Sequence, residues 1–109
     1  MKDAGYFLVV RFWIAPEAEA PMLRWLDESH MAEVAHQPGF LWCKRLRLPE
    51  RSEQGWAGFS MLYGIENQAA FERYNGNKAL HEKFAKEREP FMKHMKIDRF
   101  HGEVVAHAP

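Results

Sequence analysis

The stretch GYFLVVRFWIAP, residues 5–16, decides the fold, and Phe, Val, Ile, Tyr and Trp predominate in it. β-Branched and aromatic residues favour a strand, and Pro16 ends this one after about nine residues. Side chains alternate between the two faces of a strand, and both sets are largely apolar here. A strand that is apolar on both faces is covered on both sides. The sequence therefore predicts a central strand with a packed layer above and below it.

The segments that follow predict the element order β-α-β-β-α-β. The first helix begins near Glu17 or at Pro21, and a Pro-Gly pair ends it. The second helical segment is broken at the Asn-Gly-Asn turn signal of residues 75–77, and Pro90 kinks or ends it. The remaining elements are expected as a strand at 40–48, a polar turn at 49–55, a second hairpin strand at 56–65, helical structure across 66–95, and a last strand at 97–106.

This order is that of the ferredoxin-like split βαβ arrangement, an α+β fold. Two helices cover one face of a four-stranded antiparallel sheet. A chain of 109 residues is expected to form a single domain, residues 1–109, and it has no third layer to offer. Because the other sheet face also carries apolar residues, we expect a second copy of the chain to cover it in a homodimer.

Composition excludes several classes of function. The net charge is zero, whereas nucleic-acid-binding proteins usually carry a basic excess, so no nucleic-acid partner is expected. The apolar run at 6–14 is too short for a membrane span and contains Arg11. The single cysteine, Cys43, permits no internal disulfide and is either a small buried side chain or a reactive thiol. No signal-peptide pattern is found, so the expected location is the reducing cytoplasm.

The first helix carries the leading candidate for chemistry, His30. It belongs to an apolar stripe with Leu23, Leu26 and Val34, at helical spacing. An imidazole, with a pKa of about 6.5, exchanges protons near neutral pH, and burial favours its neutral form. His30 is therefore either a general base in a pocket or a packed histidine bonded to backbone or to a tyrosine. Trp25 is expected on the opposite side of this helix, as part of an outward contact surface.

Four further aromatic residues are candidates for the same pocket, each with core packing as the alternative. Tyr63, at the end of the third strand, could bond a ligand oxygen or orient His30. Trp42 could wall an aromatic ligand, and Tyr74 and Phe71 could line the cavity from the second helical segment. Arg11 either holds a carboxylate or phenolate or, as we favour, pairs with an acid of the partner chain.

No metal or nucleotide site is expected. His81, His94 and His101 form no pair at the spacing of zinc ligands. The sequence also lacks a Gly-rich phosphate loop and the residue order of a serine hydrolase. The charged run 81–89 is interpreted as a solvated helix face.

Taken together, these segments resemble the dimeric α/β-barrel superfamily, which includes antibiotic-biosynthesis monooxygenases, ethyl tert-butyl ether degradation proteins and muconolactone isomerases. The sequence is also similar to an uncharacterised bacterial subgroup with a Trp-x-x-x-x-His helix and a strand ending in Tyr. The resemblance covers almost the whole chain. It rests on YFLVVRFWI at 6–14, WLDESHMAEV at 25–34, PGF at 38–40, FSMLY at 59–63 and FERYNGNKALHEKF at 71–84.

The resemblance implies that two sheets face each other across a dimer, with a ligand cavity between each sheet and its own helices. His30 would point into that cavity. Haem-degrading relatives pair a histidine of the second helix with an asparagine of the first strand. This first strand has no asparagine, so no haem or other cofactor is expected.

These observations predict a small cofactor-independent enzyme, of monooxygenase or isomerase type, acting on an apolar aromatic metabolite. His30 would abstract a proton, Tyr63 would hold the developing oxyanion, and Trp42 and Tyr74 would stack on the ligand. The alternative is a non-catalytic dimeric protein that binds a small molecule or serves in a stress response. A cavity that reaches solvent and a free His30 nitrogen favour the enzyme, whereas a sealed cavity or a backbone-bonded His30 favours the alternative.

Overall fold

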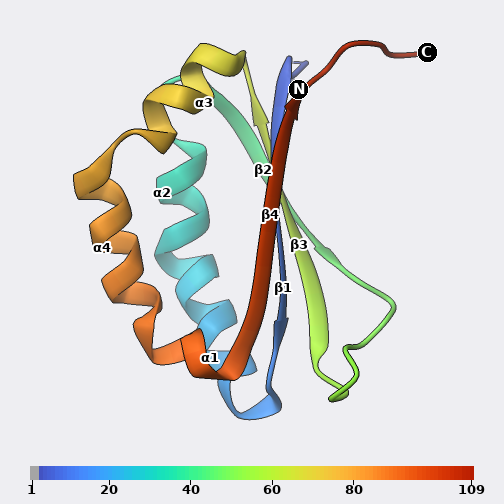
Figure 1. Cartoon of the computed structure of the whole chain (residues 1–109), viewed down its shortest axis with the longest axis vertical. Coiled ribbons are helices and arrows are strands. Elements are labelled where there is room, and N and C mark those ends of the chain that lie inside the picture. Colours follow the sequence, from blue (N-terminus) through green and yellow to red (C-terminus); the bar gives the residue numbers. More distant parts are fainter. Residues whose placement is uncertain (1–2) are drawn as a thin grey trace.

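The computed structural model describes residues 3–109 and confirms the predicted ferredoxin-like α+β fold (Figure 1). Four antiparallel strands form one sheet in the order β2-β3-β1-β4. All helices lie on one side of that sheet (Figure 1). The strands are β1 (Tyr6–Ile14), β2 (Phe40–Arg47), β3 (Ala57–Ile65) and β4 (Met95–Glu103); the helices are α1 (Pro16–Trp25), α2 (Met31–Ala35), α3 (Gln68–Asn75) and α4 (Lys78–Arg88).

Strand β1 is central, as its two apolar faces predict. It pairs along its whole length with β3, from Tyr6 opposite Ile65, and with β4, from Tyr6 opposite Glu103. The helix-facing side chains of β1 form the middle of the core, where Leu8, Phe12 and Ile14 are buried. No helix of residues 3–109 covers the opposite sheet face (Figure 1). Apolar side chains lie there as well, namely Phe7, Val9, Trp13, Trp42, Leu62 and Phe100.

The first helical segment contains a feature that the apolar spacing does not predict. A π-helical turn, η1 (Leu26–His30), separates α1 from α2, and the amide of Met31 donates to the carbonyl of Leu26. Because a π turn bonds residue i to residue i+5, side chains five positions apart lie one above the other. The ring of Trp25 therefore stacks on that of His30, with centroids 4.3 Å apart. The expectation that Trp25 lies opposite His30 is wrong for this reason.

The second helical segment breaks where the sequence indicates. Asn67 and Asn77 are the N-caps of α3 and α4, and their side-chain oxygens accept from the amides of Ala70 and Leu80. Pro90 follows the end of α4 and is the second residue of a 3₁₀ helix, η2 (Glu89–His94). Strand β4 then begins two residues earlier and ends three residues earlier than expected.

Within residues 3–109, no helix combines the length and apolar character needed to cross a membrane.

Candidate functional site

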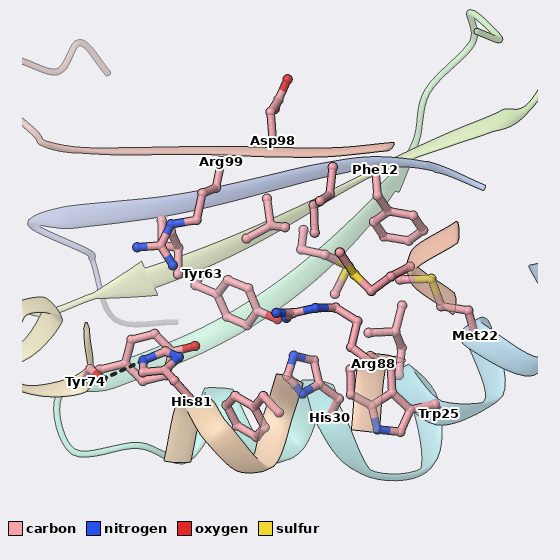
Figure 2. A pocket seen from close by; sticks show the side chains of 17 residues that line it. Phe12, Met22, Trp25, His30, Tyr63, Tyr74, His81, Arg88, Asp98 and Arg99 are labelled. Atoms are coloured by element: carbon pink, nitrogen blue, oxygen red, sulfur yellow. Dashed lines mark hydrogen bonds between the residues drawn. The ribbon is translucent and has the colours of Figure 1, made fainter. Parts of the chain in front are cut away.

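A cavity of about 250 Å³ lies between the sheet and the helices and is partly open to solvent (Figure 2). Its sheet side is mainly apolar, with Leu8, Val10 and Phe12 of β1 and Met61 of β3. Polar side chains from η1, α3, α4, β3 and β4 line the rest of the cavity. The volume suits a ligand of one or two fused rings.

His30 lies in this cavity between two aromatic rings. It stacks on Trp25 and meets Phe84 edge to face, with the latter ring centroids 4.4 Å apart. Its Nδ1 atom is buried and has no hydrogen-bond partner among the described residues. Nε2 also has no such partner but is not buried, and Figure 2 shows one ring nitrogen directed into the cavity. The ring is therefore not bonded to backbone.

The surroundings of His30 favour its neutral form, as its position in an apolar stripe predicts. Burial, followed by the positive charge of Arg88, lowers the pKa of His30 from 6.5 to about 4. Glu87 and Glu33 oppose that shift, and Lys83 adds to it. At neutral pH the imidazole therefore carries one proton and offers one free lone pair.

Both predicted tyrosines, Tyr63 and Tyr74, line the same cavity. Tyr63 is buried, and this burial, with Cys43 and Tyr74 nearby, raises the pKa of its hydroxyl. Burial likewise raises the pKa of Tyr74, whose carbonyl accepts a 2.9 Å hydrogen bond from Nε2 of His81. Both phenols therefore stay protonated and can donate to a ligand. Burial also raises the pKa of the Cys43 thiol to about 11, which is not the environment of a reactive thiolate.

The other predicted site residues lie outside the cavity. A bulge between Phe40 and Trp42 shifts the register of β2, so Trp42 lies opposite Gly64 on the open sheet face, against Phe7. Phe71 stacks instead on Tyr6 and His101 beside the cavity lining.

Arg11 lies on the open face of β1. It forms a two-point ion pair with Asp98, with Nε–Oδ1 and Nη2–Oδ2 distances of 3.0 and 2.9 Å. The acid that pairs with Arg11 within the chain is therefore Asp98, while an acid of the partner chain stays a prediction. The adjacent strand β4 supplies this carboxylate because Arg11 and Asp98 are direct cross-strand neighbours.

Among the lining residues that sequence reasoning did not assign to the pocket are Trp25, Arg88 and Arg99. Arg88 ends α4 and makes no hydrogen bond or ion pair with any described residue, whereas Arg99 donates to Asn75 at 2.8 Å. A signal for Arg88 existed, because it follows the inward-facing Phe84 by four positions and so shares its helix face. In the described chain, no cluster of three or more His, Cys, Asp or Glu side chains could hold a metal ion.

The protein-family model of DUF4286, a domain of unknown function, matches residues 6–108. The chain belongs to the DUF4286 family. No curated protein matches the sequence of this DUF4286 chain.

Solved structures show what this DUF4286 domain is similar to. A dimeric ferredoxin-like protein from an uncultured marine organism has a TM-score of 0.71 at 14% identity, with 95% of this chain and 98% of that chain covered. An ethyl tert-butyl ether degradation family protein from Bacillus halodurans has a TM-score of 0.62 at 12% sequence identity, with 92% of this chain and 99% of that chain covered. SnoaB, a cofactor-independent oxygenase from Streptomyces nogalater, has a TM-score of 0.60 at 17% sequence identity, with 97% of this chain and 99% of that chain covered. The predicted superfamily resemblance is thereby confirmed at the level of fold.

Proposed function

We propose that this DUF4286 protein binds a small aromatic metabolite in the cavity and converts it without a cofactor, as a monooxygenase or isomerase with His30 as general base. One observation carries the proposal: His30 is neutral and unbonded to backbone, and it lies in a cavity that opens to solvent. The fold shared with SnoaB, described as a cofactor-independent oxygenase, supports the reaction class.

The chemistry follows from the groups that line the cavity. The free lone pair of His30 takes a proton from a phenol or an acidic C–H bond. Tyr63 stays protonated and donates a hydrogen bond to the oxygen on which negative charge develops. In an isomerisation the proton returns to another carbon. In an oxygenation the carbanion reduces O₂, one oxygen atom enters the ring as a carbonyl, and the other leaves as water.

A non-catalytic binding role is the second candidate, and one observation favours it. A pKa of about 4 makes His30 a weak base at neutral pH, whereas general bases work best with a pKa near the operating pH. The same cavity would then bind the ligand through Tyr63 and the aromatic walls without turnover.

The test uses 1-naphthol and 1,3-dihydroxynaphthalene as electron-rich phenols. Oxygen uptake reports oxygenation, and proton exchange in D₂O reports carbanion formation. We expect the wild-type protein to promote one of these two reactions. His30→Ala should lower its rate at least about 100-fold, whereas the control His107→Ala, in the exposed tail, should keep the wild-type rate. Binding without either reaction would establish the non-catalytic role, and equal rates for His30→Ala would reject His30 as the base.

We also propose that the open sheet face pairs with a second copy of the chain. Phe100 is 55% exposed there, and Phe7, Trp13 and Leu62 are only half-buried. The dimeric state named for the marine relative supports this arrangement. Light scattering after gel filtration should give a dimer for the wild type and a monomer for Leu62→Lys. The control Val105→Lys, in the exposed tail, should remain dimeric, and a monomeric wild type would reject the pairing.

A further inference from the structure

The geometry points to an anionic ligand: an aromatic or hydroxyaromatic carboxylate whose negative group binds Arg88 at the rim of the cavity. This inference rests on the proposed function and specifies its substrate class. It comes from the charges that face the cavity and from Arg88, a guanidinium of the cavity lining that has no hydrogen-bond or ion-pair partner among residues 3–109.

Arg88 is half-buried in the cavity lining at the end of α4. It forms no hydrogen bond or ion pair with the rest of residues 3–109, although a guanidinium offers five donors. Figure 2 shows its side chain extending into the cavity between Tyr63 and His30. An unpaired cation in a partly desolvated site is costly unless a ligand supplies the opposite charge.

The acids near the cavity do not supply that charge. Asp98 belongs to the lining, but its side chain points away, toward Arg11 on the open face (Figure 2). Glu33 and Glu87 do not line the cavity, and both pair with Lys83, at 2.7 and 3.1 Å. The other oxygen of Glu87, Oε1, is buried and has no hydrogen-bond partner among the described residues.

Arg99 adds a second positive charge to the lining, but its Nη2 already donates to Asn75. A single free guanidinium suits a monoanion with two oxygens, because carboxylate and guanidinium form parallel hydrogen bonds. A carboxylate therefore fits better than a polyanion. The apolar sheet side, with Leu8, Val10 and Met61, would take the hydrocarbon rings, and His30 and Tyr63 would face a ring hydroxyl or acidic carbon.

The experiment compares carboxylates with uncharged amides of nearly the same shape. Isothermal titration calorimetry at pH 7 measures binding of benzoate, 2-naphthoate and 3-hydroxy-2-naphthoate, and of the three corresponding primary amides. The variant Arg88→Gln removes the guanidinium and keeps a polar side chain. The matched control, Arg73→Gln, removes the same charge from an exposed position on α3 outside the cavity.

We expect at least one carboxylate to bind the wild type roughly 10- to 100-fold more tightly than its amide. Arg88→Gln should abolish that preference and leave amide affinity within about twofold, while Arg73→Gln should keep it. Equal binding of acid and amide, unchanged by Arg88→Gln, would overturn the anionic ligand while leaving the cavity as a binding site. Failure of all six compounds to bind would overturn both this inference and the proposed site.

Discussion

Replacing His30 with phenylalanine should remove a defined part of the acid sensitivity of the protein. In the folded state the pKa of His30 is lowered to about 4, chiefly by burial, from 6.5. Between these two pH values the unfolded chain binds a proton that the folded chain does not. The contribution to the unfolding free energy is therefore complete above pH 6.5 and is lost as the pH falls toward 4. The difference of about 2.5 pH units, at about 1.4 kcal/mol each, amounts to roughly 3–4 kcal/mol.

The measurement is urea denaturation followed by circular dichroism at pH 7, 5 and 4, at one protein concentration because association also contributes to stability. Between pH 7 and 4, the wild type should lose roughly 3 kcal/mol more than His30→Phe, because at pH 4 a pKa of about 4 leaves part of the full contribution still to be lost. Phenylalanine preserves the stacked ring between Trp25 and Phe84 but cannot take a proton. The control His107→Phe, in the exposed tail, should follow the wild type. Parallel losses for wild type and His30→Phe would refute the assignment of His30 as a buried neutral imidazole.

Three further changes test the packing around the cavity. In urea denaturation, Gly39→Ala should lower the free energy of unfolding by at least about 1 kcal/mol more than Gly55→Ala does. Both glycines have positive φ, but only at Gly39 would the new Cβ lie 2.4 Å from a carbon of α3. Phe84→Ala should lower the unfolding free energy by about 3–5 kcal/mol, and NMR titration should show the pKa of His30 rising toward 6.5 as water enters. Tyr63→Phe should weaken calorimetric binding of 1-naphthol by roughly 5- to 10-fold, and an unchanged affinity would exclude its hydroxyl as a ligand donor.

The sequence predicted the architecture because the decisive signals were local. Apolar side chains on both faces of β1 placed that strand at the centre, and the Asn-Gly-Asn turn located the break before α4. The helical spacing of apolar residues in the first helical segment correctly placed His30 among apolar side chains. These signals depend on periodicity and turn chemistry within a few residues.

The missed features depend on irregularities that periodicity cannot show. The π turn brought Trp25 onto His30, and the bulge in β2 moved Trp42 to the open face. Each is a one-residue departure from a regular repeat, which changes the side of every following side chain. Arg88 was missed for another reason: a charged run was interpreted as solvated, although one member follows the inward Phe84 by a helical turn.

The most direct test of the central claim is NMR of the histidine side chains during titration with 2-naphthoate. Long-range ¹H–¹⁵N correlations report the state of each imidazole nitrogen. The account predicts that the ring nitrogens of His30 shift with ligand, while those of His36 and His107, which do not line the cavity, stay unchanged. Binding detected by calorimetry without any change at His30 would place the ligand elsewhere and contradict the account.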